Sequence, residues 1–203
     1  PKYADAYFNM GVALKHKGEI DAAIKSYKQA LKVKPDYFEA HLNIGVALRE
    51  KGQIDAAIDS YQRAIKIKPD FADSYLNIGS ALQEKGDFQS AIESYNQAIN
   101  IKPNHAEAHR NLSMIKKYKD WDEQYIQMER LYFDPNITDE NLCSLCFALA
   151  KANEDMGDIS QSFKYLKQGN TIRKKILGYS TTQYEKLFDH LKHASKTITL
   201  NTL

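Results

Sequence analysis

Cysteine is scarce in this chain, with two among 203 residues. That number is too small for a disulfide framework and favours a reducing, cytoplasmic setting. Cys143 and Cys146 form a single CxxC, whereas a structural zinc site needs four ligands. Because both lie in an apolar helical pattern, we interpret them as buried core thiols. The sequence therefore predicts no metal and no cofactor.

Long apolar runs and an excess of one charge are also absent. No apolar stretch approaches the ~20 residues that span a bilayer, so no membrane association is expected. The net charge is only +2, from 28 basic and 26 acidic residues, and nucleic-acid binding requires a clustered basic stripe. His105 and His109 lie four residues apart without evident further ligands, and we interpret them as core or surface histidines. No residue pattern indicates catalysis by this chain.

What the chain does contain is a repeat. Residues 1–34, 35–68 and 69–102 align without a gap, and Pro103 opens a fourth copy. A fixed period of this length is typical of a helix–turn–helix solenoid. Each copy holds two helical patterns separated by a glycine such as Gly52, which suits a left-handed helix end. A proline such as Pro69 follows the second pattern and cannot continue it.

Small and bulky residues recur in register within these copies. The recurring residues are Gly11, Gly45 and Gly79; Ala23, Ala57 and Ala91; Ala30, Ala64 and Ala98; and Tyr27, Tyr61 and Tyr95. Together with the prolines, this pattern resembles the tetratricopeptide repeat (TPR), over residues 1 to about 118. The resemblance implies an all-α, right-handed TPR superhelix, an α-solenoid of antiparallel helix pairs. It also implies a concave groove lined by the first helix of each pair, and a protein or an extended peptide as partner.

The repeats predict the following division of the chain. Residues 1–134 are TPR repeats, with 1–34, 35–68 and 69–102 regular and 103–134 degenerate, its second helix running from Trp121 to Phe133. Residues 135–178 form a degenerate fifth helix pair, in which Phe163 and Leu166 supply apolar contacts of the second helix. Residues 179–195 form a capping helix with Tyr184, Leu187, Phe188 and Leu191 at helical spacing. Residues 196–203 are a linker or a truncated end.

A second resemblance concerns residues 109 to 180. The runs HRNLSMIKKYK, LCFALAKANEDMGD and FKYLKQGNTIRKKILGY resemble the stretch before the catalytic domain in bacterial TPR-sulfotransferase proteins. In that family a sulfotransferase domain would follow, but this chain shows no glycine-rich phosphate loop and no catalytic residue is carried over. The resemblance leaves a second hypothesis open, a non-catalytic arm of a sulfotransferase or an O-GlcNAc-transferase-like enzyme that presents substrates or dimerises.

Asparagine recurs on the first helix of each copy. These residues, the asparagine ladder, are Asn9, Asn43, Asn77 and Asn111. A carboxamide both donates and accepts hydrogen bonds, so a row of them suits the backbone of an extended peptide. The TPR domain of O-linked N-acetylglucosamine transferases is similar, with asparagines in the same register lining its groove. Alternatively, the amides bridge neighbouring helices or persist from duplication.

Other residues are expected around the asparagine ladder. Phe8, Leu42 and Leu76 would contact ligand side chains, or else pack between repeats. Lys15 and Arg49 would line the groove edge among mixed charges. A homodimer formed through the convex face or one end is a further possibility.

An acidic row recurs near the start of the first helices, at Asp5, Glu39, Asp73 and Glu107. We interpret it chiefly as capping boxes in which Asp36, Asp70 and Asn104 are the N-caps, and otherwise as a preference for basic ligands. Chaperone-tail binders of the TPR family use lysine and arginine near these places to clamp a terminal carboxylate. The acids found here argue against that function.

Overall fold

The computed structural model describes residues 2–178, and that part of the chain folds into ten α-helices without a strand. Three regular pairs come first: α1 (Lys2–His16) with α2 (Ile20–Val33), α3 (Phe38–Glu50) with α4 (Ile54–Ile67), and α5 (Ala72–Lys85) with α6 (Phe88–Ile101). They are followed by α7 (Ala106–Ile115), α8 (Glu123–Tyr132), α9 (Asp139–Asp155) and α10 (Ile159–Ile176).

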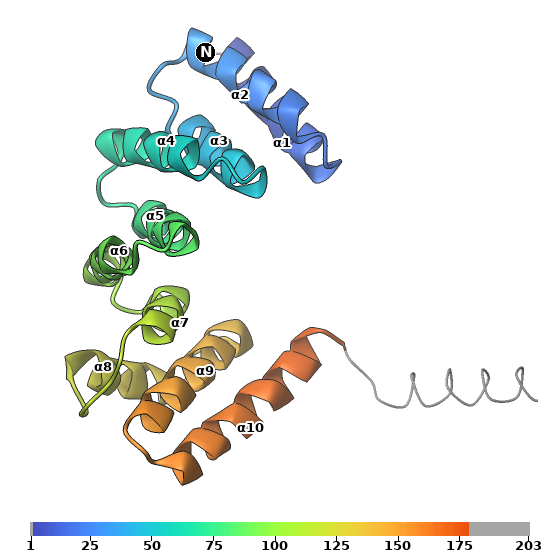
Figure 1. Cartoon of the computed structure of the whole chain (residues 1–203). Helices are drawn as coiled ribbons and strands as arrows, with labels where there is room; N and C mark the ends of the chain where they lie inside the picture. Colours follow the sequence, from blue (N-terminus) through green and yellow to red (C-terminus); the bar gives the residue numbers. More distant parts are fainter. Residues whose placement is uncertain (1, 179–203) are drawn as a thin grey trace, which may run out of the picture.

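The helices stack into an arc (Figure 1). In the three regular pairs, each first helix packs on its own second helix, which in turn packs on the first helix that follows; α7 instead packs chiefly on α9, on which α8 also packs. In Figure 1, α3, α5 and α7 lie on the inner side of the arc, and α4 and α6 lie on its outer side. The predicted all-α solenoid is thus confirmed, and the inner helices are the ones that can meet a ligand along the curve.

The turns within and between pairs follow from glycine and proline. Gly52 adopts φ +73°, a conformation that L side chains rarely take, and ends the first helix of its pair as predicted. The second helices stop at Val33, Ile67 and Ile101, each two residues before a proline. Each regular pair therefore turns at equivalent residues, so the helices of the three pairs begin and end at matching positions of the repeat.

The predicted capping boxes are wrong. The N-cap positions of α3, α5 and α7 are held by Tyr37, Phe71 and His105, and none of these side chains caps the helix. These helices begin two residues after Asp36, Asp70 and Asn104, which lie outside the N-cap position. The acidic row consequently falls inside the first turns, where negative charge complements the helix dipole.

The fourth pair departs from the regular form. Ser113 replaces the repeated glycine and shares a 2.8 Å hydrogen bond with the hydroxyl of Tyr118, which is 1% exposed. Asp155 of α9 holds the same segment by accepting from the Tyr118 backbone N–H at 3.3 Å. The second helix, expected from Trp121, begins only at Glu123, and Trp121 lies outside it with 71% of its surface exposed.

The fifth pair, α9 and α10, is in close contact near Gly169, where an added Cβ would lie 3.1 Å from that of Cys146. Cys146 is buried and Cys143 is half-buried, and both are free thiols. Phe163 and Leu166, predicted to supply apolar contacts of the second helix, are both exposed, at 66% and 39%. The predicted capping helix over 179–195 and the linker over 196–203 lie outside the described residues. Across the described stretch, each helix is too short or too polar to traverse a bilayer.

Candidate functional site

A tyrosine from the second helix of each regular pair lies directly beneath the glycine of the first. A Cβ added to Gly45 would meet the Tyr61 ring at 2.4 Å, and the corresponding distances for Gly11 and Gly79 are 2.5 Å. The three rings are fully buried. Since no side chain fits there, the glycines bring the tyrosine hydroxyls close to the inner helices.

The Tyr95 hydroxyl shows where these side chains end. It donates to Oε1 of Gln83 on α5 at 2.8 Å, and Oγ of Ser80 lies 3.4 Å from it. Burial raises the pKa of Tyr95, and hydrogen bonding to Ser80 and Asn111 partly offsets this increase. Residues from three successive inner helices meet around this hydroxyl, so it forms part of the groove wall. The sequence indicated these tyrosines only as bulky residues of the repeat, in register with the glycines, and not as residues at the groove.

A cavity of about 390 Å³ opens at this place. The residues that line it come from α3, α5, α6 and α7 and are all polar or charged: Arg49, Ser80, Gln83, Glu84, Tyr95, Glu107 and Asn111. Its wall therefore offers amide, hydroxyl, carboxylate and guanidinium groups. Such a lining suits polar backbone and side-chain groups better than apolar ones.

The asparagine ladder is only partly assembled at the cavity. Asn111 lines it, whereas Asn9, Asn43 and Asn77 do not. Asn9 is exposed and the other three are half-buried. The Nδ2 atom of Asn43 donates to the Glu39 carbonyl of its own helix at 2.8 Å, which leaves its side-chain oxygen available to accept.

The three apolar residues near the ladder pack within the protein. Phe8 lies 5.7 Å from the Tyr27 ring and 5.0 Å from the Tyr37 ring, measured between centroids. Leu42 is half-buried beside a core cluster that includes Tyr61. Leu76 is only 7% exposed. Each therefore stabilises neighbouring pairs, and Phe8 and Leu42 retain some surface on the groove.

The two basic residues expected at the groove edge form ion pairs between successive pairs. Lys15 Nζ lies 3.0 Å from a Glu50 carboxylate oxygen, and Arg49 Nε lies 3.6 Å from one of Glu84. Of the two, only Arg49 reaches the cavity. Both pairs are partly exposed, so each adds little stability. Their main effect is to balance charge along the inner side of the arc.

Buried tyrosines and histidines supply no reactive group here. Burial raises the pKa of Tyr61 to about 12, with Arg49 acting in the opposite direction. His109 is fully buried and contacts the Pro103 carbonyl through Nε2 at 2.9 Å. Burial likewise raises the pKa of Cys146 to about 12, so its thiol stays protonated. Between residues 2 and 178, no three His, Cys, Asp or Glu side chains converge as metal ligands.

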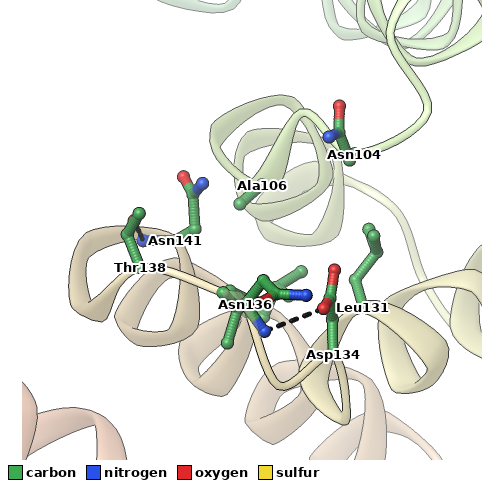
Figure 2. A pocket seen from close by; sticks show the side chains of 9 residues that line it. Asn104, Ala106, Leu131, Asp134, Asn136, Thr138 and Asn141 are labelled. Atoms are coloured by element: carbon green, nitrogen blue, oxygen red, sulfur yellow. Dashed lines mark hydrogen bonds between the residues drawn. The ribbon is translucent and has the colours of Figure 1, made fainter.

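A second, smaller cavity of about 90 Å³ lies between the start of α7 and the turn before α9. Figure 2 shows Asn104, Asn136 and Asn141 around it, and the Asn136 backbone N–H donates to Asp134 at 2.9 Å. The space suffices for a few water molecules. It provides no room for a peptide.

Comparison with known families agrees with this geometry. A family model described as TPR repeat matches three consecutive segments, residues 13–48, 45–86 and 79–113. The chain is a tetratricopeptide-repeat (TPR) protein. Its matched TPR segments run from the last turn of α1 through the remaining helices of the three regular pairs and include most of α7. No curated protein sequence matches the chain.

Several solved structures are similar to this chain. MamA is 23% identical with a TM-score of 0.62, covering 83% of this chain and 97% of MamA. The first TPR of Spaghetti (RPAP3), bound to the HSP90 peptide SRMEEVD, is 20% identical with a TM-score of 0.55. The match covers 56% of this chain and 90% of the Spaghetti chain. The O-GlcNAc transferase of Thermobaculum terrenum is 22% identical with a TM-score of 0.56. The match covers 64% of this chain and 26% of the transferase. At these identities the likeness establishes the fold alone.

Proposed function

We propose that this TPR protein binds an extended peptide segment of a partner protein along the inner side of its arc. The observation that carries the proposal is the polar cavity of about 390 Å³, which joins residues from three successive inner helices. A segment lying across those helices would meet Asn111, Gln83 and the Ser80 hydroxyl in turn. Their amide and hydroxyl groups pair with peptide N–H and C=O groups irrespective of sequence.

The charges of the groove support a protein partner over a nucleic acid. Lys15 and Arg49 face Glu50 and Glu84, so the inner side carries both signs and no basic stripe. Phosphate backbones need clustered, uncompensated cations. We propose a polar, uncharged or weakly basic peptide as ligand, because Glu107 at the cavity forms no ion pair within residues 2–178.

A peptide-library pull-down tests the proposal. Wild type is compared with an Asn77→Ala, Asn111→Ala variant, and a control carries Asn96→Ala and Asn100→Ala on exposed positions of α6. We expect wild type and the control to enrich the same peptides, and the ladder variant to lose them while its circular dichroism stays unchanged. Equal enrichment by all three proteins would contradict the role of the asparagine ladder.

If wild type enriches no peptide, the groove proposal itself fails. The hypothesis of a non-catalytic arm of a larger transferase would then be the better account, as would a dimerisation arm. Sedimentation velocity at several concentrations separates these two, because only the dimerisation arm would change its sedimentation coefficient with concentration.

A further inference from the structure

A charged residue interrupts an apolar column that runs along the first helices of the pairs. The position ten residues before each turn glycine is occupied by an apolar side chain: Phe8, Leu42, Leu76 and Phe147. In α7 the equivalent residue, seven positions after Pro103, is Arg110. Other members of the column pack between repeats, as Phe8 does against Tyr37. Apolar packing therefore does not account for a guanidinium at this place.

Arg110 is held in place by the next member of the column. Its guanidinium carbon Cζ lies over the Phe147 ring of α9, 5.8 Å from the ring centroid. Its Nε atom is buried and has no hydrogen-bond partner within residues 2–178. An unpaired buried N–H is costly, so the protein keeps this side chain at the expense of stability. Such a local conflict is typical of a residue retained for binding.

A second arginine reaches the same ring from α10. Cζ of the exposed Arg173 lies 5.9 Å from the Phe147 centroid. Burial raises the pKa of the Cys143 thiol on α9, and the charges of Arg173 and Arg110 act in the opposite direction. Both cations therefore lie near this thiol. Side chains of α7 and α10 thus bring two positive charges to one place on α9.

No acid balances these two charges in the part of the chain that the structure describes. Neither Arg110 nor Arg173 forms an ion pair there, whereas Lys175, two residues further along α10, pairs with Asp139 at 2.6 Å. The two basic residues at the groove edge are also paired, with glutamates. Like charges that lie close together repel each other. An anion bound beside both arginines would remove this repulsion.

We propose that Arg110 and Arg173 form a binding site for a phosphate group beside Phe147. A guanidinium presents its N–H groups in a planar fork that matches phosphate oxygens. A phosphate monoester carries about 1.5 to 2 negative charges near pH 7. It therefore neutralises both cations, which a single carboxylate does not.

The arginine site is separate from the polar cavity. Neither Arg110 nor Arg173 lines that cavity, so phosphate binding is independent of the peptide binding proposed above. Two cations suffice for one phosphate group, whereas a nucleic-acid backbone needs a longer basic stripe. The ligand is accordingly a phosphate ion or a molecule that carries one phosphate group.

Titration of the isotope-labelled protein tests the proposal. Inorganic phosphate and O-phosphoserine represent free and esterified phosphate, acetate represents a carboxylate, and sodium chloride keeps the ionic strength constant. The readout is the Nε–Hε nuclear magnetic resonance signals of the arginine side chains. Arg110→Leu and Arg173→Gln assign the two signals, and each removes one cation. The matched control is Lys174→Gln, which removes the same charge from the exposed residue next to Arg173.

We expect phosphate to shift both signals and to saturate them at lower concentrations than acetate. Each arginine variant should bind phosphate about tenfold more weakly or worse, because it loses charge-assisted hydrogen bonds. Lys174→Gln should stay within about twofold of wild type. Saturation by inorganic phosphate alone would assign the site to the free ion, and saturation by both probes would extend it to phosphate esters.

Three results would overturn the proposal: no saturating shift with either phosphate probe, equal affinity for phosphate and acetate, or full affinity in one of the arginine variants. Circular dichroism establishes that each variant is folded. Arg110→Leu supplies the side chain that Leu42 and Leu76 have in the same register, so it should fold. Arg173→Gln changes an exposed side chain and keeps the test decisive if Arg110→Leu does not fold.

Discussion

The Asp73 carboxylate lies 2.8 Å from the Nε2 atom of His105, and this contact joins the third helix pair to α7. The same link recurs between Asp5 and Tyr37, whose hydroxyl donates to the carboxylate at 2.9 Å. In both cases the acceptor lies in the first turn of one pair, and its partner lies at the N-cap of the next inner helix. The acidic row therefore connects neighbouring repeats wherever a polar partner is present.

Asp73→Ala should destabilise the protein more than Glu39→Ala does, because both changes remove a charge from a first turn but only Asp73 has a buried partner. His105 is 7% exposed and would lose its partner, which costs about 1–3 kcal/mol for a buried polar group. Glu39 holds the equivalent place, but the residue opposite it is Phe71, which cannot hydrogen-bond. Urea unfolding followed by circular dichroism compares the two, and equal midpoints would refute the linking role of Asp73.

Removing one tyrosine hydroxyl should have opposite effects in two adjacent pairs. The Tyr95 hydroxyl donates to Gln83, so Tyr95→Phe should cost about 1 kcal/mol. The Tyr61 hydroxyl is buried and has no hydrogen-bond partner in the structure, so Tyr61→Phe should leave stability unchanged or increase it. Chemical denaturation of both variants measures the difference, and a larger loss for Tyr61→Phe would contradict this assignment.

Gly79→Ala should destabilise the third pair through a steric clash. The new methyl group would lie 2.5 Å from the Tyr95 ring, and overpacking of this kind costs about 1–3 kcal/mol. Replacing Tyr95 by Leu in the same chain makes space, so the double variant should lose less than the sum of the single changes. A double-mutant cycle of unfolding free energies provides the measurement. Strict additivity would show that the two residues do not interact.

Mild acid should weaken the fold through His109. Burial lowers the pKa of His109, with a smaller contribution from His105 and Lys116, although the bond to the Pro103 carbonyl opposes the decrease. The unfolded chain therefore takes up a proton first, near pH 6.5, and stability is lost as pH falls from there toward the lower pKa of the folded state. Unfolding free energies at pH 8 and pH 5 should differ less for His109→Gln than for wild type.

The peptide SRMEEVD, which the first TPR of Spaghetti holds, should not bind here. Acidic residues stand at the start of the inner helices, and Glu84 and Glu107 line the cavity. A peptide with two glutamates, an aspartate and a terminal carboxylate would meet like charges. Fluorescence anisotropy with the labelled peptide at low salt tests this, and micromolar binding would disprove the proposed charge preference.

Much of the fold could be read from the repeat because its signals are local and recur. Glycine at the turns, proline after the second helices and the apolar spacing each fix a helix boundary independently of distant contacts. The Gly45 and Tyr61 register even indicated which residues approach closely. Comparison among three copies distinguished this pattern from chance, which a single copy would not have allowed.

The details that were missed depend on contacts across pairs. The capping-box pattern around Asp36 matched a local rule, yet the helix starts later and Tyr37 turns toward Asp5 instead. Tyr118 is buried by Ser113 and Asp155, which lie on different helices. The Tyr95 hydroxyl at the cavity was overlooked because the position of its end depends on Gln83 and on the neighbouring α7.

The two kinds of contact in this arc differ in chemistry. Within a pair, the ring of Tyr61 lies so close to Gly45 that no side chain fits between them. Between pairs, part of the connection is made by exposed ion pairs such as Lys85 with Asp55, 2.7 Å apart, which salt screens. We therefore expect added salt to weaken the contacts between pairs more than the contacts within a pair.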